Sequence, residues 1–401
     1  MVMSSRERIL TTLDHKEPDR VPIAMGNIYE QAYRRLCKYL GLKLERVSQK
    51  YSLVTLINEK IREKFALDNF VNVTGLANFG RFFTTHIVEG FCPETKRAID
   101  YECGLIATSD KLSKIFTDEY GCKFQYKGVG GPYPIYHPLK NAKTIRDLEK
   151  YNHWPDPEDP SWVLQDANKI VKKLHDAIDG VFYTAASPIF HRYQHLRGFN
   201  QWLIDMKLNP ELYKAITEKI LYINLRLTMR SLNEIGEYVD LLVLNDDMGT
   251  TVGPFMSVKD YRRFVKPYYK EFVETVKREF PKIKVWYHCH GSVLPLVPDI
   301  IECGIDVLNP VLPQDNMEPN VLKKEFGSKL SFDGAIDIQQ IVPFGSTDEV
   351  REHVKKVIKV LAPGGGYILR AQIINPVTPP ENICALYEAA LEYGRYPIDC
   401  A

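Results

Sequence analysis

The chain has 401 residues, of which 45% are hydrophobic and 26% charged, and its formal net charge is +1. This composition is typical of a globular protein with a large core. The balanced charge gives no electrostatic basis for binding nucleic acid or a membrane surface, and no apolar run approaches the ~18 residues of a membrane-spanning helix. The start lacks an apolar signal core, and the eight cysteines include no Cys-x-x-Cys pair. We therefore expect a cytoplasmic protein.

The first third of the chain contains two predicted strands and three predicted helices. A short helix over 4–15 begins at Ser4 or Ser5, with Glu7 in capping-box position. A strand over 20–25, two helices within 29–65 and a β-rich run over 70–74 follow.

The segment from about 81 to 160 has a different character. It is rich in Gly, Pro and Tyr, with short alternating runs and two loops punctuated by proline. We interpret it as a β-hairpin-type insertion that covers one end of the fold, and not as an independent domain.

A regular alternation of helices and strands begins near residue 162. Helices are predicted over 162–177, 194–206, 210–235, 258–280, 293–302, 319–326, 346–361 and 380–393. With the two early strands, the predicted strands cover 20–25, 70–74, 180–184, 240–244, 284–287, 306–309, 330–333 and 366–370. Such alternation predicts a (β/α)₈ barrel in one domain spanning 1–401. The alternative is a doubly wound sheet, but residues 25–29 do not form the Gly-rich phosphate loop that it would need after the first strand.

The strand over 284–287 ends in a pair of histidines. His288 and His290 are two residues apart, so on a strand both can face the same side. In a barrel the other strand ends converge on the same mouth, and they contribute Met25, Asn27, Ser187, Asn245, Asp246, Asp247, Asn309, Asp333, Arg370 and Gln372. Imidazoles, carboxylates and one guanidinium around a pocket can hold a metal or perform acid–base chemistry.

Each of these residues also has a structural interpretation. Asp333 can cap the next turn, Arg370 can pair with an aspartate, and residues 246–249 can form the turn that closes a strand. The two histidines can be hydrogen-bonded core or loop residues.

Several motifs carry a resemblance to a known family. They lie at residues 5–22, 117–121, 196–198, 246–249, 253–257, 261–268, 309–310, 333–337 and 378–382, in order over essentially the whole chain. The chain resembles the uroporphyrinogen decarboxylase superfamily, and within it the corrinoid-dependent methyltransferases. The resemblance implies a (β/α)₈ barrel.

Two departures from the superfamily's patterns narrow the expected activity. The resemblance places an arginine-rich element of the true decarboxylases at residues 24–29, where this chain has none. Members that methylate thiols bind zinc through His-x-Cys-Gly and a later Cys. Here His288 aligns with the histidine, but His290 stands at the first cysteine position and the later cysteine aligns near Gln372. Losing both sulfurs leaves a harder, more Lewis-acidic centre or no metal.

The leading hypothesis is a methyltransferase component of an O-demethylase. It would demethylate a methoxylated, aromatic substrate and pass the methyl group to cob(I)alamin on a partner corrinoid protein. His288 and His290, with Asp246 or Asp247, would hold zinc or act as the acid at the ether oxygen. The substrate would contact Asn27, Asn309, Asp333, Arg370 and Gln372.

Other hypotheses stay open from the sequence. One is a methyltransferase of the same fold that handles thiols or methylamines, and another is a barrel that has lost its chemistry and serves as a binding subunit. The cobalamin-binding motif of corrinoid proteins does not occur in this chain. A homodimer is compatible with the sequence.

Overall fold

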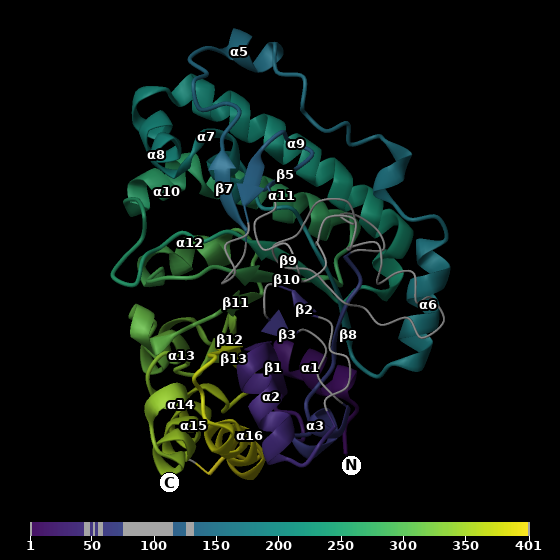
Figure 1. Ribbon diagram of the computed structural model, residues 1–401, viewed down its shortest axis with the longest axis vertical. Helices are drawn as coiled ribbons and strands as arrows, with labels where there is room; N and C mark the ends of the chain where they lie inside the picture. The colour runs from purple at the N-terminus through teal and green to yellow at the C-terminus, as the bar shows by residue number, and fades with distance from the viewer. Residues whose placement is uncertain are drawn as a thin grey trace.

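The computed structural model describes residues 2–43, 49–50, 53–54, 59–74, 115–125 and 132–399. Within them, eight parallel strands form a nearly closed barrel surrounded by helices, so the predicted (β/α)₈ fold is confirmed (Figure 1). The strands are β1 (Ile23–Tyr29), β4 (Phe70–Asn72), β8 (Val181–Ala185), β9 (Leu241–Asn245), β10 (Lys284–His288), β11 (Val307–Asn309), β12 (Ser331–Ala335) and β13 (Tyr367–Ile374). Their hydrogen-bonded order is β1-β13-β12-β11-β10-β9-β8-β4, and β2 (Gln49–Lys50) and β3 (Leu53–Val54) extend the sheet beyond β1.

The surrounding helices bury an apolar stripe against the barrel. In α15 the buried residues are Val350, Val354, Val357, Ile358 and Leu361, which recur at the helical period. The helices outside the strands are α2 (Glu30–Tyr39), α3 (Glu59–Lys64), α6 (Ala167–Ala177), α7 (Phe190–Arg197), α8 (Phe199–Leu208), α9 (Pro210–Ile235), α10 (Val258–Phe264), α11 (Lys266–Glu279), α12 (Val297–Glu302), α13 (Pro319–Phe326), α14 (Ile341–Phe344), α15 (Thr347–Leu361) and α16 (Pro380–Tyr393). None of the described helices is long and apolar enough to cross a membrane.

Two predicted helices are each two helices in the structure. The segment 258–280 breaks at Val265, between α10 and α11. Pro267 in the first turn of α11 explains the break, because its ring would clash with the carbonyl of Arg263 in a continuous helix. The segment around 194–206 divides into α7 and α8 at Gly198, whose φ of 92° ends the first helix.

The barrel interior is layered. At the amino-terminal face, Ile9 and Leu13 of α1 (Ser5–Leu13) pack inside the barrel against one residue from each of several strands: Ala24, Val181, Leu241, Val307 and Ile368. Above this layer lie the aromatic residues Phe70, Tyr183 and Trp286. Because side chains alternate along a strand, the next inward residue of β10 after Trp286 is His288.

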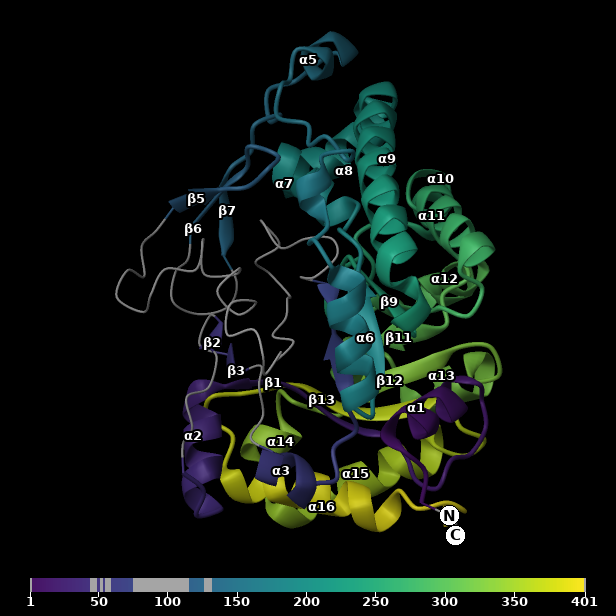
Figure 2. The same ribbon diagram turned by 90° about the vertical axis from the view of Figure 1, so that its right-hand side faces the viewer.

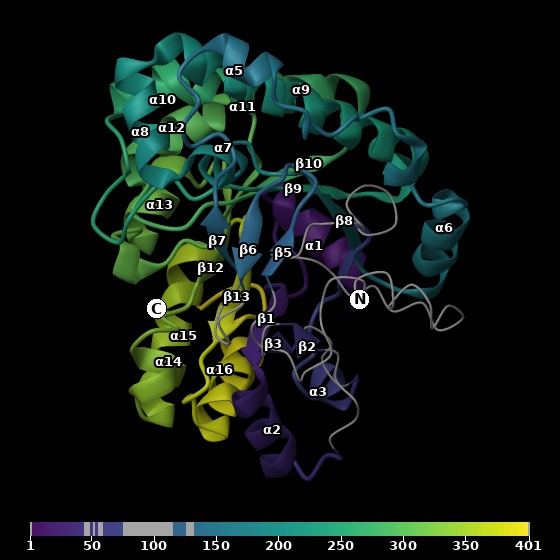
Figure 3. The same cartoon turned by 45° about the horizontal axis from the view of Figure 1, so that its top comes forward.

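The described part of the predicted insertion forms a separate antiparallel sheet of β5 (Ile115–Thr117), β6 (Lys123–Gln125) and β7 (Tyr133–Tyr136). Figures 2 and 3 show this sheet outside the barrel, and α5 (Ile145–Glu149) follows it. The buried Arg192 of α7 pairs with Asp118, and Arg197 donates to the carbonyl oxygens of Lys140 and Ala142 at 3.1 and 2.9 Å. Helix α7 therefore holds the insertion. Residues 81–114 of the predicted insertion lie outside the described residues.

Candidate functional site

The carboxyl ends of the strands bring His288 to the mouth of the barrel. His288 pairs in register with Asn245 of β9 and Asn309 of β11. Its neighbour Cys289 faces the other way and is fully buried in the core outside the barrel, as the alternation predicted. Burial raises the pKa of the Cys289 thiol, so this sulfur is an inert core group.

A chain of hydrogen bonds runs from His288 into the barrel. Its Nδ1 lies 2.6 Å from Oδ1 of Asn309, and Nδ2 of Asn309 donates to Oδ1 of Asp333 at 2.7 Å. Nδ2 also lies 3.1 Å from Oε1 of Gln372. Nε of Arg370 donates to both oxygens of Asp333, at 2.8 and 3.0 Å. Predicted site residues from β10, β11, β12 and β13 are thus joined in one network.

This network assigns the tautomer of His288. A carboxylate accepts only, so the amide nitrogen of Asn309 must face Asp333 and its oxygen must face His288. His288 therefore donates from Nδ1, and in the neutral ring the basic nitrogen is Nε2. Burial is the strongest influence on His288 and lowers its pKa, while the nearby Asp247 carboxylate acts in the opposite direction.

Arg370 closes the lower end of the network. Its side chain is 9% exposed, and its guanidinium carbon lies 4.4 Å from the ring centroid of Phe70 and 5.1 Å from that of Trp286. Stacking on these rings and pairing with Asp333 stabilise the buried charge. Arg370 thus forms part of the aromatic layer beneath the mouth.

Asp247 interacts electrostatically with His288 and His290. Its Oδ1 accepts the backbone N–H of His290 at 2.8 Å, and the two imidazole rings are 5.2 Å apart. Burial raises the pKa of Asp247, but the neighbouring histidines and the N–H of His290 outweigh it, so the pKa is lowered overall. Asp247 is therefore ionised at neutral pH.

Asp246 has a different environment from its neighbour. Its carboxylate accepts the backbone N–H groups of Ile189, Phe190 and His191 at 2.8, 3.1 and 2.6 Å. It also accepts the hydroxyl of Tyr269 at 2.6 Å. These donors belong to the amino-terminal end of α7 and to α11, so Asp246 anchors α7 to the end of β9. Burial raises the pKa of Asp246, against the influence of these donors and of His191.

His191 is a site residue that the sequence analysis missed. Its Nε2 accepts the backbone N–H of Asp247 at 3.3 Å and lies 3.8 Å from Oδ2 of that residue. Its Nδ1 lies 3.7 Å from Oδ1 of Asp246. The only sequence signal is its place just after the Ser187–Pro188 turn that follows β8, which is weak.

In the described part of the chain, the side chains of Asn27 and His290, like those of Asp246 and Asp247, make no hydrogen bond to the network of His288. Asn27 lies two residues after Met25, and the alternation puts both on the face of β1 that packs with the outer core. The side chain of His290 turns toward Asp315, with Nδ1 3.9 Å from Oδ2. His290 nevertheless stays at the mouth, because its ring lies edge-on to that of His288.

The described side chains do not fit the predicted zinc site. Among the described residues, no three His, Cys, Asp or Glu side chains are arranged to hold a metal ion. The imidazole of His290 turns toward Asp315 and does not converge with a carboxylate and His288 on one point.

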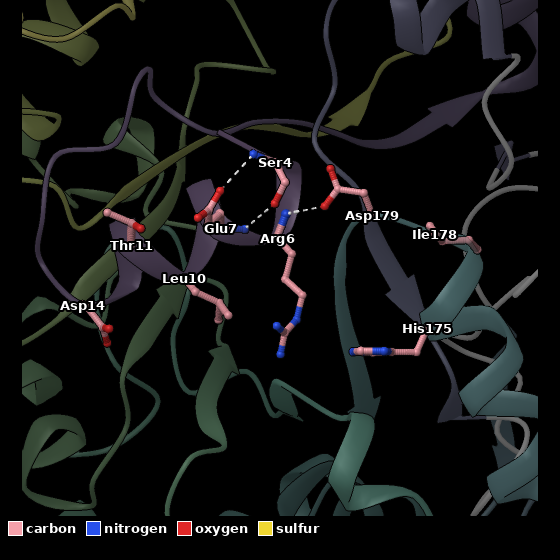
Figure 4. Close-up of a pocket in the computed structure, with 9 residues that line it drawn as sticks. All are labelled: Ser4, Arg6, Glu7, Leu10, Thr11, Asp14, His175, Ile178 and Asp179. Atoms are coloured by element: carbon pink, nitrogen blue, oxygen red, sulfur yellow. Dashed lines mark hydrogen bonds between the residues drawn. The ribbon is translucent and has the colours of Figure 1, made fainter. Parts of the chain in front are cut away.

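A pocket of about 360 Å³ lies at the opposite, amino-terminal face of the barrel (Figure 4). Both oxygens of Asp179 accept backbone N–H groups, from Ser5 at 2.6 Å and Arg6 at 3.1 Å. The guanidinium of Arg6 binds Asp240 through two hydrogen bonds of 2.6 and 3.2 Å. These charges are used to fasten α1 under the barrel, as expected of the stability face of this fold.

Comparisons with known proteins agree on the fold. The uroporphyrinogen decarboxylase of Rickettsia felis is 29% identical over 182 residues, which are 45% of this chain and 47% of that protein. The chain thus aligns with less than half of that relative. The uroporphyrinogen decarboxylase of Geotalea daltonii is 22% identical over 275 residues, covering 64% of this chain and 72% of that protein.

A solved structure extends the likeness to nearly the whole chain. A methyltransferase from Methanosarcina mazei superposes with a TM-score of 0.60 at 16% identity, covering 98% of this chain and 99% of that one. At this identity the likeness concerns the fold alone. The family model for uroporphyrinogen decarboxylase (URO-D) matches residues 113–393, and the chain therefore belongs to this family.

Proposed function

We propose that this chain is a corrinoid-dependent methyltransferase that demethylates a methoxylated aromatic substrate. The methyl group passes to cob(I)alamin carried by a partner corrinoid protein, which serves as the second substrate. The observation that carries the proposal is the network that fixes Nδ1 of His288 as a donor and so makes Nε2 the basic nitrogen of the neutral ring.

The chemistry requires a proton at the leaving oxygen. An aryl methyl ether is a poor electrophile because its leaving group is a phenolate. Cob(I)alamin supplies the electron pair that forms the new bond to the methyl carbon. The C–O bond breaks, its electron pair stays on the aryl oxygen, and that oxygen takes a proton from Nε2 of protonated His288. The products are a phenol and methylcobalamin, and His288 ends as the neutral tautomer that Asn309 already stabilises.

Other residues prepare His288 for this step. The ionised Asp247 stabilises the imidazolium form, since its charge raises the pKa of His288. Asn309 and Asp333 are positioning residues that keep the ring oriented. Phe70, Tyr183 and Trp286, with Arg370 stacked on two of these rings, form an aromatic floor beneath the mouth.

Two observations favour this activity over decarboxylation of a porphyrinogen. The end of β1, residues 24–29, carries no cationic side chain to bind substrate carboxylates. The guanidinium of Arg370 at the same mouth is already engaged with Asp333. The thiol branch is disfavoured because Cys289, the sulfur nearest in sequence, is buried on the outer side of β10.

The test is the formation of methylcobalamin from methoxyarenes and chemically reduced free cob(I)alamin, followed by absorbance together with release of the phenol. The wild-type chain should react only when a methoxyarene is present. His288→Gln should lower the rate by at least ~100-fold, the contribution of a general acid. His153→Gln, on an exposed residue of the insertion, is the matched control and should react as wild type.

Three results would contradict the proposal. They are full activity of His288→Gln, methylcobalamin formation that does not depend on the arene, and decarboxylation of uroporphyrinogen by the wild-type chain.

A further inference from the structure

From the charges around the barrel mouth we infer that the methyl donor is an uncharged arene and that the site rejects carboxylated ones. The inference rests on the proposed function, because it concerns the substrate of that same site. It is carried by three features of the described residues: a buried ion pair, a ring of amide side chains and loops without lysine or arginine.

The first feature is the ion pair beneath the mouth. Nε of Arg370 donates to both oxygens of Asp333, and the pair is 9% and 1% exposed. A carboxylate that approached Arg370 would also approach Asp333, and the two negative charges would repel. Asp333 therefore offsets the charge of Arg370 before any substrate arrives, although Nη2 of Arg370 is buried without a hydrogen-bond partner among the described residues.

The second feature is the inward-facing layer directly above the aromatic rings. By the alternation along each strand, Asn72 follows Phe70, Asn245 follows Val243, Asn309 follows Val307, and Gln372 follows Arg370. His288 completes this ring of side chains. Amides donate and accept hydrogen bonds without a net charge. Asn309 and the oxygen of Asn72 are bonded within the protein, so Asn245 and Gln372 are the amides of this ring that suit the oxygens of a neutral molecule.

The third feature is the composition of the loops that rise from the strands at the mouth. The segments joining β8, β9, β10, β11, β12 and β13 to the elements that follow are 186–189, 246–257, 289–296, 310–318, 336–340 and 375–379. They contain no lysine or arginine, although the chain has 52 of these residues. Their charged residues are all acidic: Asp246, Asp247, Asp315, Glu318 and Asp337.

These loops give the described mouth a neutral to negative potential. Asp247 contributes a full negative charge beside His288, because its pKa is lowered. A cleft lined by charges of one sign repels ligands that carry a charge of the same sign. A neutral arene escapes this repulsion.

The test compares three ligands that share one ring and differ only in charge. They are 2-methoxy-4-methylphenol (neutral), 4-hydroxy-3-methoxybenzoate (negative) and 4-hydroxy-3-methoxybenzylamine (positive). Binding to the full chain is measured by calorimetry without a corrinoid, so the result does not depend on turnover. The neutral ligand should bind at least ten-fold more tightly than the benzoate, and this margin should shrink with added salt. The benzylamine, whose charge the mouth does not repel, should not lose affinity in this way.

Two substitutions locate the cause of the selectivity. Asp333→Asn keeps the shape of the side chain and releases the charge of Arg370, so the benzoate should gain at least ten-fold in affinity relative to the neutral ligand. Asp247→Asn, at a side chain that is 35% exposed, is a second variant that keeps the test decisive if Asp333→Asn does not fold. It should raise the affinity for the benzoate by a smaller factor, of several-fold. Asp348→Asn, on the exposed start of α15, is the matched control and should change neither affinity.

The outcomes separate the inference from the proposed function. Equal or tighter binding of the benzoate by the wild-type chain would overturn the inference, and methyl transfer from the benzoate would leave the proposed function standing. Preference for the neutral ligand supports the inference even if no methyl transfer follows, and that lack of transfer would count against the proposed function.

Discussion

At the scale of single residues, the site depends on the protonation state of His288. Its Nδ1 is held by Asn309 at 2.6 Å, and Asn309 is oriented in turn by Asp333. The sequence alone placed His288 and the other polar residues at the ends of predicted strands. It could not give the tautomer of His288, because the tautomer depends on which amide atom of Asn309 faces Asp333 on the neighbouring strand.

The pH dependence of methyl transfer follows from the pKa of His288. Burial lowers this pKa below 6.5, and only the protonated ring can donate to the leaving oxygen. The value of kcat/KM should therefore fall as pH rises through a pKa below 6.5. Because the charge of Asp247 raises the pKa of His288, Asp247→Asn should shift this fall to lower pH.

The control for this pH shift is Asp337→Asn. Asp337 is also acidic and on a mouth loop, but its Oδ1 accepts the backbone N–H groups of Gln339 and Gln340, as an asparagine oxygen can. Its pH profile should match that of the wild type. A profile of Asp247→Asn that stays in place, or moves to higher pH, would remove Asp247 from the proposed role.

At the scale of elements, α7 connects the site with the insertion. Its first N–H groups bind Asp246 at the end of β9, and Arg192 further along the helix pairs with Asp118 of the insertion. The sequence predicted Asp246 as catalytic because it follows a strand in a (β/α)₈ pattern. Its backbone hydrogen-bond donors lie more than 50 residues earlier in the chain, at 189–191, so no local pattern could reveal its contact with α7.

Substitutions at Asp246 distinguish a catalytic role from that of an anchor. Asp246→Asn keeps an oxygen that can accept N–H groups of α7, so it should retain most of the activity. Asp246→Ala removes every acceptor and should lower the free energy of unfolding by about 2 kcal/mol, measured by urea denaturation. Equal losses of activity in both variants, with no difference in stability, would indicate that the carboxylate takes part in the reaction.

Element boundaries were predictable where local chemistry sets them. The strands over 284–288 and 241–245 follow β-branched and apolar runs, and α15 begins at the capping box of Ser346 and Glu349. The break at Val265 was missed, although Pro267 marks it, because the apolar spacing continues on both sides. His191 was missed because it lies inside a helix and not at a strand end.

At the scale of the whole molecule, the two ends of the barrel have separate tasks. The carboxyl ends carry the His288 network, while the amino-terminal face holds ion pairs that fasten α1 and the chain before β1. There Asp68 accepts from Arg8 at 2.6 Å, from Arg20 at 2.8 Å and from the backbone of Ile23 at 2.8 Å. This division is typical of (β/α)₈ enzymes.

Removing Asp68 should therefore affect stability and not chemistry. Asp68 is 4% exposed, and Asp68→Ala leaves two arginines near an empty carboxylate position. The free energy of unfolding should fall by ~3–5 kcal/mol, the cost of breaking a buried pair. The KM for the methoxyarene, measured at a temperature where the variant is folded, should be unchanged. A raised KM without a loss of stability would contradict the separation of the two faces.

The most direct test of the proposed function follows the methyl group itself. The wild-type chain is incubated with chemically reduced cob(I)alamin and a methoxyarene whose methyl group carries deuterium, and the corrinoid is analysed by mass spectrometry. The proposal predicts trideuteromethylcobalamin and an equal amount of the corresponding phenol. Deuterium that stays on the arene across a broad panel of neutral methoxyarenes, while the chain is folded and the cobalamin reduced, would contradict it.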